Sequence, residues 1–378
     1  MVPGIVFINQ ATGYLTIDIV NKFTSDFENV VLITGSIRVQ DIQLDPKVKI
    51  EYIALYDRGN NIRKAISWII GSIQIFILLR FKYTRYDKFF FTVPPTAYLM
   101  ASWFNGNFSI LVFDLYPEAL CANGFSNNGL LYKWWENRNR KVFKCSYRIF
   151  TLSEIMSSAI KRYSPGRDVI VIPNWSAFSH LKPIKKGNNI ILRREGFRDK
   201  FIVQYSGNIG VTHNVETLID VANCLRCEKG IVFQIIGRGE KMNQIARMIS
   251  EKALSNCILL PFRKDEELFE SLCAADLAVI ILDPKTPNIS IPSKIYNIMA
   301  AGLPVMAIAS YGSGLADLVV NHNIGKVLEK NDIQGMCSFV IKLRNDSDLR
   351  RMYTSNSIKA SLLYTSDNAG KYLQSYIQ

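Results

Sequence analysis

Short runs of β-branched and aromatic residues alternate with longer stretches of helical periodicity along the whole chain. In residues 215–225, for example, apolar residues recur at the spacing of one helix face. Strands that alternate with helices form parallel sheets covered on both faces, so the pattern predicts an α/β fold with two doubly wound domains. The predicted strands are residues 5–9, 30–34, 49–53, 88–93, 110–114, 148–151 and 169–172, then 201–206, 232–236, 258–260, 277–282 and 305–309.

The alternation is interrupted over residues 173–200, which hold two prolines and many Lys, Arg and Asn residues. We therefore predict a first domain over residues 1–173 and a second over residues 174–359. A C-terminal helix at about 360–378 is expected to pack back on the first domain. In doubly wound domains ligands bind beyond the carboxyl ends of the strands, which points to a cleft between the two domains.

Length and composition agree with this division. A chain of 378 residues and 43.0 kDa, 48% hydrophobic and 20% charged, suits two domains and excludes a disordered or low-complexity protein. Seven cysteines without regular spacing exclude a secreted disulfide scaffold and favour a reducing cytoplasm. The first residues, MVPGIVFINQ, predict a strand and not a cleavable signal peptide.

Positive charge is concentrated in the first half of the chain. The net charge is +13, and residues 1–190 carry 23 basic against 13 acidic residues. This excess favours an anionic partner, such as a lipid headgroup layer or a diphosphate lipid. Nucleic acid is not expected, because the basic residues are interleaved with Trp and apolar runs and no nucleic-acid module occurs.

Two segments of the first half have a composition suited to membranes. Residues 65–79 are apolar but shorter than the roughly 20 residues of a spanning helix, so we favour a buried core helix that does not span. Residues 131–148 combine Trp134 and Trp135 with six basic residues. That composition suits either a helix in the headgroup layer or a solvated helix.

Candidate chemistry lies in the second half. In residues 288–305, NISIPSKIYNIMAAGLPV, Pro292 and Ser293 predict a helix start, and Gly302 ends the helix with Pro304. Lys294 then falls in the first turn, where the helix dipole disfavours a cation unless a phosphate is bound there.

Two glycine-containing loops follow predicted strands in the same half. The first, in FIVQYSGNIGVTHN, contains Gly207, Gly210 and His213; the second, in IIGRGEK, contains Gly237 and Gly239. Glycines let a ligand approach the backbone, but the second loop lacks the spacing of a dinucleotide fingerprint.

The order of these motifs resembles the C-terminal half of a GT-B glycosyltransferase of family 4, in the bacterial branch that assembles O-antigen, capsule and colanic-acid-type polysaccharides. The segments SGNIG, IIGRGEK, LPF, AADLAVIIL and PSKIYNIMAAGLPV carry this resemblance. FINQATG, FTVPP, FDLYPE, FTLSE and VIPNW extend it through the first half. The resemblance implies a GT-B fold of two Rossmann-like domains facing a central cleft.

The resemblance also implies roles for matching residues. The second domain is expected to bind the donor, with Lys294 and the helix start at Ser293 at its diphosphate. Asp114 and Glu118 are expected at the acceptor side, and Lys294, Asp114, Glu118 and His213 are the candidate catalytic residues. The remaining donor-binding candidates are Gly13, Gly207 and Asn208 at the phosphates, and Gly237, Arg238, Phe262, Arg263 and Asn297 at the base and ribose.

Two departures from the family pattern concern the donor. The pattern has two Glu residues at the positions of Ile289 and Asn297, and an Arg/Lys pair that is absent from the loop at residues 207–213. Asn297 can still donate a hydrogen bond to a ribose, and Lys294 supplies part of the missing charge.

The function implied is retaining transfer of a hexosyl or N-acetylhexosaminyl group from a nucleotide sugar, with UDP favoured, to a polyprenyl-diphosphate-linked saccharide. The leaving phosphate can accept the proton of the acceptor. The enzyme is expected at the inner face of the cytoplasmic membrane, without cofactor or metal; the single DxD, residues 346–348, predicts a helix cap. A nucleotide-sugar 2-epimerase and an inactive nucleotide-sugar-binding partner remain open alternatives.

Overall fold

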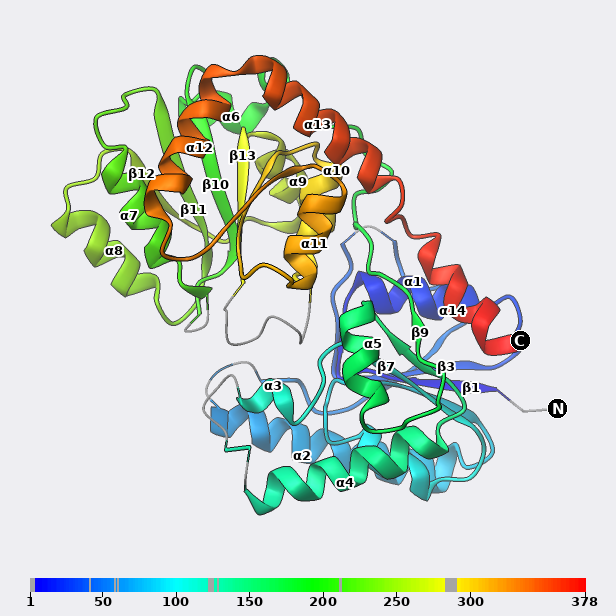
Figure 1. Ribbon diagram of the computed structural model, residues 1–378. Helices are drawn as coiled ribbons and strands as arrows, with labels where there is room; N and C mark the ends of the chain where they lie inside the picture. The colour runs from blue at the N-terminus through cyan, green and yellow to red at the C-terminus, as the bar shows by residue number, and fades with distance from the viewer. Residues whose placement is uncertain are drawn as a thin grey trace. The chain divides into compact units, whose positions relative to one another are not determined.

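The computed structural model describes residues 4–40, 42–57, 59, 61–121, 126–127, 129–210, 213–282 and 291–378 (Figure 1). These residues divide into two compact units. Unit 1 holds residues 4–177 and 366–378, and unit 2 holds residues 178–282 and 291–365. The sequence-based boundary at 173/174 compares with 177/178 in the structure.

Unit 1 is built on a seven-stranded sheet in the order β5-β3-β1-β6-β7-β8-β9, and every neighbouring pair is parallel. All seven strands predicted for the first half are confirmed. Their observed bounds are β1 (Ile5–Ile8), β3 (Val30–Thr34), β5 (Lys49–Tyr52), β6 (Asp87–Phe91), β7 (Phe108–Val112), β8 (Ile149–Thr151) and β9 (Ile170–Val171). The two-residue strands β2 (Ala11–Thr12) and β4 (Ser36–Ile37), which the sequence pattern did not predict, pair separately.

Helices cover both faces of this sheet (Figure 1). Helices α1 (Tyr14–Phe23) and α14 (Asn368–Ile377) lie on one face, and α2 (Asn61–Ile77) and α4 (Leu130–Cys145) lie on the other. The shorter helices are α3 (Glu118–Cys121) and α5 (Glu154–Lys161), the π-helical turn η1 (Leu78–Lys82) and the 3₁₀-helix η2 (Tyr98–Trp103).

The C-terminal helix α14 is attached to unit 1 through aromatic residues. The Tyr376 ring packs edge-on against Phe23 of α1 at 5.5 Å, and its hydroxyl donates to Asp87 Oδ2 at 2.7 Å. Tyr372 is fully buried and contacts Phe150 at 5.1 Å. Because these rings bury large apolar areas, the last helix is part of the core of unit 1.

Unit 2 is built on a six-stranded parallel sheet in the order β12-β11-β10-β13-β14-β15. Its strands are β10 (Phe201–Asn208), β11 (Ile231–Arg238), β12 (Cys257–Pro261), β13 (Leu277–Ile281), β14 (Val305–Ile308) and β15 (Gly325–Leu328). The five predicted strands are confirmed, and β15 was missed. It is an edge strand of only four residues, two of which are not buried, so its hydrophobic signal is weak.

The helices of unit 2 follow the expected alternation with strands (Figure 1). The predicted helix at 215–225 corresponds to α7, and Asp346 caps α13 by accepting from the Leu349 N–H at 2.8 Å, as the DxD segment predicted. The helices are η3 (Lys186–Asn188), α6 (Ile190–Glu195), α7 (Glu216–Cys224), α8 (Met242–Glu251), α9 (Asp265–Cys273), α10 (Lys294–Ala300), α11 (Gly314–Asn321), α12 (Ile333–Asn345) and α13 (Ser347–Ser361).

Helix α2 differs from the core helix that its composition predicted. Only one face is buried, through residues such as Trp68 and Ile75, while six isoleucines are exposed on the rest of the helix: Ile62, Ile66, Ile69, Ile70, Ile73 and Ile77. Because η1 continues the helix, residues 62–82 form one stretch that is long and apolar enough to cross a membrane by length and composition alone. Burial on the sheet accounts for one third of this stretch.

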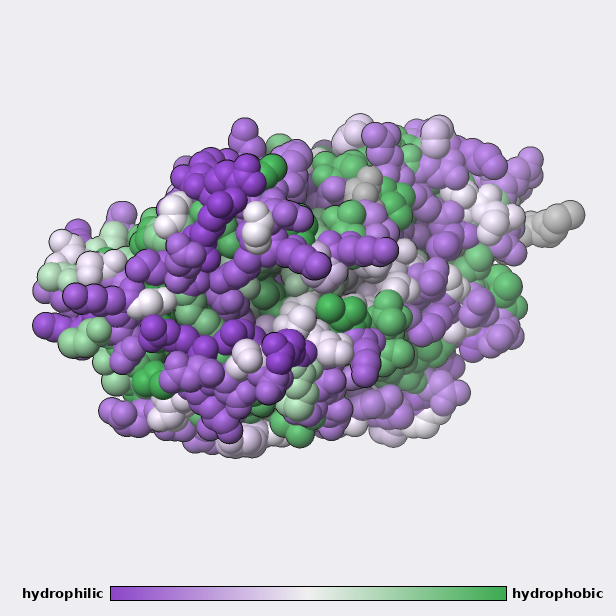
Figure 2. Space-filling model, turned by 90° about the horizontal axis from the view of Figure 1, so that it is seen from above, coloured by the Kyte–Doolittle hydropathy of each residue, from purple (hydrophilic) through white to green (hydrophobic). Residues whose placement is uncertain are grey.

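The face seen in Figure 2 has a different character. There, hydrophilic side chains predominate, and hydrophobic ones occur in separate groups between them. Scattered apolar groups of this kind are typical of a protein surface, whereas a continuous apolar stripe such as that of α2 indicates a partner.

Candidate functional site

The two glycine-containing segments of unit 2 lie side by side at the carboxyl ends of β10 and β11. In the parallel register Gly207 pairs with Gly237, and Asn208 pairs with Arg238. A Cβ atom at Gly237 would lie 2.0 Å from the Gly207 carbonyl oxygen, so only glycine fits there. The close approach of β10 and β11 at this point therefore requires glycine at position 237.

Lys294 lies against the end of β10. Helix α10 begins at Lys294, directly after Ser293, and ends at Ala300 before Gly302, as the sequence predicted. The Lys294 Nζ atom lies 4.1 Å from the centre of the Tyr205 ring, in a cation–π contact. A Cβ atom at Gly207 would lie only 3.1 Å from the same Nζ. The absence of a side chain at Gly207 thus leaves room above the ammonium group.

The surroundings of Lys294 disfavour the charged form of this lysine. Burial lowers the pKa of Lys294 from the usual lysine value to about 7. Among the residues that the structure describes, no carboxylate opposes this shift. A lysine whose pKa is lowered by burial is a frequent feature of functional sites, including those that bind an anion.

The two arginines predicted at the base and ribose have different surroundings. Arg238, at the end of β11, is exposed and stacks on the ring of Phe262 at 5.1 Å. The guanidinium of Arg263 forms a mostly buried ion pair with Glu195 of α6. The charge of Arg263 is therefore compensated within the unit, so Arg238 is the better candidate for contact with a ligand.

The remaining candidates of unit 2 lie around the same strand end. Asn208 is exposed, and its carbonyl accepts from the Tyr205 hydroxyl at 2.6 Å. The His213 backbone N–H donates to the Gly210 carbonyl, so His213 lies at the end of the same loop. Ser293 is exposed and Asn297 is half-buried on α10. Ile289 lies outside the described residues.

Unit 1 carries the two acidic candidates directly after β7. The backbone N–H groups of Phe113 and Asp114 donate to the Thr92 hydroxyl at 3.1 and 3.4 Å. Burial raises the pKa of Asp114 above its usual value, and the charge of Lys64 opposes part of this increase. The carboxyl group of Asp114 thus lies in a poorly solvated position near a lysine.

Glu118 is the first residue of α3 and has one satisfied carboxyl oxygen. Its Oε1 accepts from the Tyr163 hydroxyl at 2.6 Å, while its buried Oε2 has no hydrogen-bond partner among the residues that the structure describes. Burial raises the pKa of Glu118, although the bond from Tyr163 acts in the opposite direction. A buried carboxyl oxygen without a partner is suited to contact a hydroxyl of a bound molecule.

Gly13 precedes α1 in unit 1, as its N-cap residue. Its backbone φ of −119° is open to any amino acid, and a Cβ atom there would meet nothing within 4 Å among the described residues. Packing within unit 1 therefore does not require glycine at this position, in contrast to Gly237.

Sequence reasoning missed the residues that support these candidates. Tyr205 is the platform for Lys294, Thr92 holds the chain at Asp114, and Tyr163 holds Glu118. Each lies at least about 20 positions along the chain from the residue it supports, so no local spacing marks it.

Comparison with known proteins identifies a family for the second unit and relatives for the chain. Residues 189–360 match the family model described as glycosyl transferases group 1. WbjE of Pseudomonas aeruginosa, named as a probable glycosyltransferase, is 23% identical over 228 residues, 59% of this chain and 56% of that protein. WcaI of Escherichia coli (strain K12), named for colanic acid biosynthesis, is 29% identical over 150 residues, 39% of this chain and 37% of that protein. The chain thus spans about half or less of the curated relatives it matches.

Solved structures show the same fold. Anabaena Alr3699/HepE in complex with UDP-glucose aligns with a TM-score of 0.72 and 15% identity, covering 99% of this chain and 98% of that one. At this identity the likeness concerns the fold alone, which is that of the GT-B glycosyltransferases. The GT-B fold with two Rossmann-like domains that the sequence predicted is confirmed.

Proposed function

We propose that the chain transfers a sugar from a nucleotide sugar with retention of configuration. The premise is that residues 189–360 match the family model of glycosyl transferases group 1. The observation that carries the proposal is Lys294, which lies over Tyr205 beside Gly207 with a pKa lowered to about 7 by burial. A cation at the carboxyl end of parallel strands is suited to bind a diphosphate.

The chemistry requires little beyond charge and position. Cleavage of the bond between sugar and diphosphate leaves negative charge on the nucleotide, and Lys294 stabilises that charge as it develops. The leaving phosphate oxygen then accepts the proton of the acceptor hydroxyl. In this proposal Lys294 supplies the positive charge at the diphosphate, and the reaction proceeds without a metal ion.

We propose UDP as the nucleotide of the donor. Alr3699/HepE, whose structure contains UDP-glucose, shares the fold over nearly the whole chain. Arg238, stacked on Phe262 at the end of β11, is exposed beside the glycine pair and is suited to contact the base or ribose. The transferred group is proposed to be a hexosyl or N-acetylhexosaminyl group.

The proposed acceptor is a saccharide linked to polyprenyl diphosphate, as in O-antigen assembly, at the inner face of the cytoplasmic membrane. The similarity to WcaI, which is named for colanic acid biosynthesis, supports a polysaccharide pathway. The exposed isoleucines of α2 and the basic residues of α4 support contact with an anionic bilayer. Asp114 and Glu118 are proposed to contact the acceptor saccharide.

A transfer assay with three readouts tests this function. Purified full-length protein is incubated with radiolabelled UDP- and GDP-sugars, with and without bacterial polyprenyl-diphosphate-linked saccharides. Label that moves to lipid only when the saccharide lipid is present, with the donor's anomeric configuration, is the expected result. Conversion of the nucleotide sugar without lipid indicates an epimerase, and binding without turnover indicates an inactive partner; either result contradicts the proposal.

The affinity for UDP-glucose is expected to depend on the proton of Lys294. The pKa of about 7 applies to the empty site, and a bound diphosphate raises it because it favours the charged lysine. The dissociation constant should therefore be constant below pH 7 and increase above it by up to about tenfold per pH unit. Calorimetry in buffers of different ionisation enthalpy measures this together with the proton uptake. A flat profile in the unmodified protein, or a pH dependence that persists in Lys294→Met, would contradict the assignment.

Gly13 and Gly237 provide a matched pair of alanine variants. Gly237→Ala is expected to lower the free energy of unfolding by about 1–3 kcal/mol, because the new methyl group meets the Gly207 carbonyl. Gly13→Ala should lower it by no more than about 1 kcal/mol, the cost of a poorer N-cap, and yet reduce kcat/KM roughly tenfold or more. Urea unfolding and donor kinetics measure both. Full activity in Gly13→Ala would remove Gly13 from the donor site.

A further inference from the structure

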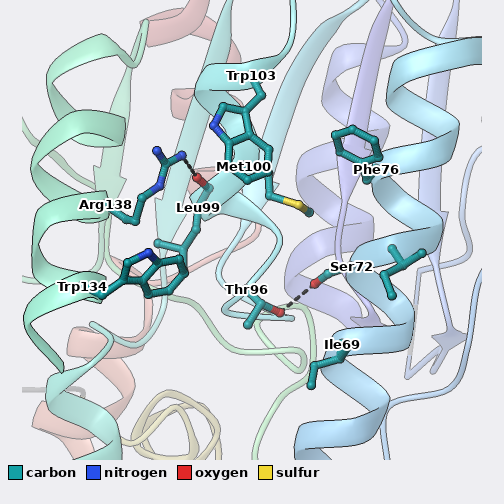
Figure 3. A pocket seen from close by; sticks show the side chains of 10 residues that line it. Ile69, Ser72, Phe76, Thr96, Leu99, Met100, Trp103, Trp134 and Arg138 are labelled. Carbon is teal, nitrogen blue, oxygen red and sulfur yellow. Dashed lines mark hydrogen bonds between the residues drawn. The ribbon is translucent and has the colours of Figure 1, made fainter. Parts of the chain in front are cut away.

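Unit 1 contains an apolar cavity of about 400 Å³ between α2, η2 and α4 (Figure 3). Its walls join the two segments whose composition suits membranes, although these are far apart in the sequence. The apolar lining comes mainly from Ile69, Ile73 and Phe76 of α2, Met100 and Trp103 of η2, and Trp134 of α4. Its volume lies in the range of cavities that hold a small ligand.

The few polar groups of the cavity already have partners. Ser72 and Thr96 hydrogen-bond to each other at 2.6 Å, and Arg138 donates to the Leu99 carbonyl (Figure 3). The Arg138 guanidinium also lies over the Trp103 ring at 5.0 Å. No carboxylate lines the cavity in the part of the chain that the structure describes. The interior therefore offers hydrocarbon and aromatic surface, which favours an apolar chain.

The elements around the cavity are strongly basic. Arg63 and Lys64 lie on α2, two basic residues lie on η1, and five lie on α4, against Glu136 as the single acidic residue of these helices. An anionic group at the end of a hydrocarbon chain in this cavity would be stabilised by the positive charge of these helices. Charge and apolar lining together indicate an amphiphile with a negative head.

Aromatic contacts connect the cavity wall with the segment that carries the acidic candidates. The Trp134 ring packs edge-on against Trp135 at 6.4 Å, and Trp135 stacks on Tyr116 at 6.0 Å. Tyr116 lies between Asp114 and Glu118 in the sequence. A prenyl chain that leaves the cavity along these rings would bring its head group to the segment where the acceptor saccharide is proposed.

We propose that this cavity holds the prenyl segment nearest the diphosphate of the lipid-linked acceptor. The inference rests on the proposed function and adds to it a subsite for the lipid chain. It separates two roles on α2: Ile69 and Ile73 line the cavity, while Ile66 and Ile77 are exposed outside it and face the bilayer. Recognition of the acceptor then includes its chain as well as its sugars.

Binding of farnesyl diphosphate, a soluble prenyl diphosphate, tests the proposal without any nucleotide sugar. Trp103 and Trp134 line the cavity and are about half exposed, at 55% and 50%, so their fluorescence should change on binding. Trp103→Phe and Trp134→Phe should each remove part of that change. Because no transfer is measured, failure of the glycosyltransferase assay would leave this result interpretable.

Ile73→Asp and Ile77→Asp form the decisive pair. Both residues are exposed isoleucines of α2, at 56% and 49%, so neither change should prevent folding, and only Ile73 lines the cavity. Ile73→Asp is expected to weaken farnesyl diphosphate binding at least about tenfold, and Ile77→Asp to leave it unchanged. Equal affinity in Ile73→Asp and the unmodified protein, or no binding at all, overturns the proposal.

Two competitors identify the source of the ligand. Inorganic diphosphate should compete weakly, because it lacks the chain; full competition would show that the cavity plays no part. A single-chain phosphatidylglycerol should bind less tightly than farnesyl diphosphate. Equal or tighter binding of this straight-chain lipid would assign the cavity to bilayer phospholipid and overturn the acceptor assignment.

Discussion

Lys294→Met is expected to lower kcat for sugar transfer about 10²–10³-fold, the effect of removing one group that stabilises a developing negative charge. The methionine side chain retains contact with Tyr205 and removes only the ammonium group. Single-turnover kinetics with a saturating UDP-sugar measure the effect on chemistry apart from binding. Lys326→Met, an exposed lysine on β15 of the same unit, is the matched control and should retain full activity.

The same substitution should not destabilise the empty protein. Because the pKa of Lys294 is lowered to about 7 by burial, the unfolded chain binds more protons between pH 7 and about 10. The free energy of unfolding therefore increases with pH over this window, and the lysine charge is least favourable at pH 7 and below. Lys294→Met should raise Tm there and flatten this pH dependence. If Lys294→Met lowered Tm, and its loss of activity matched the fraction of unfolded protein, the role of Lys294 would be structural.

Asp114→Asn is expected to lower kcat about 10²-fold or more while the KM for the nucleotide sugar changes little. The carboxylate lies directly after β7 and is proposed to accept a hydrogen bond from the acceptor hydroxyl. Since burial raises the pKa of Asp114, activity should decrease on acidification at a pH above the usual range of an aspartate. The amide cannot titrate, so this acidic decrease should be absent from the variant. Initial rates across pH measure both effects.

Asp168→Asn provides the control for a change of charge in unit 1, because Asp168 is exposed and lies in the loop before β9. It should leave the rate and its pH profile unchanged. If Asp114→Asn raised the KM for the nucleotide sugar and left kcat intact, Asp114 would belong with donor binding. If the activity of Asp114→Asn still decreased at low pH as in the unmodified protein, another group would be responsible for that decrease. Glu118 is the first candidate.

Hydrophobic patterning was sufficient to predict the fully buried strands, which are β1, β3, β6, β7, β8, β13 and β14. A strand such as β13, with five buried residues in a row, has a continuous apolar signal that no surface segment imitates. The edge strand β15 contributes few buried positions and was missed. The exposed isoleucines of α2 are the opposite case: an apolar composition suggested a core helix, and only the packing shows which face is covered.

The candidate site was predictable where chain order determines it. Helix-start residues fixed Lys294 at the first turn of α10, and the glycine loops fixed the strand ends. Tyr205 and Tyr163 were not predictable, because each contact joins elements distant in the sequence. The ion pair of Arg263 with Glu195 was also hidden, since it depends on how α6 packs against α9, the helix that follows Arg263. Local sequence patterns thus identify candidate charged residues, and the tertiary fold determines which of these charges can contact a ligand.

A structure of the full chain with bound UDP-glucose is the most direct measurement of how this protein binds a donor. We expect Lys294 Nζ within about 3 Å of a diphosphate oxygen, at the carboxyl ends of β10 and β11. A UDP-glucose molecule bound with its phosphates on other groups, and Lys294 still in contact only with Tyr205, would contradict the central claim.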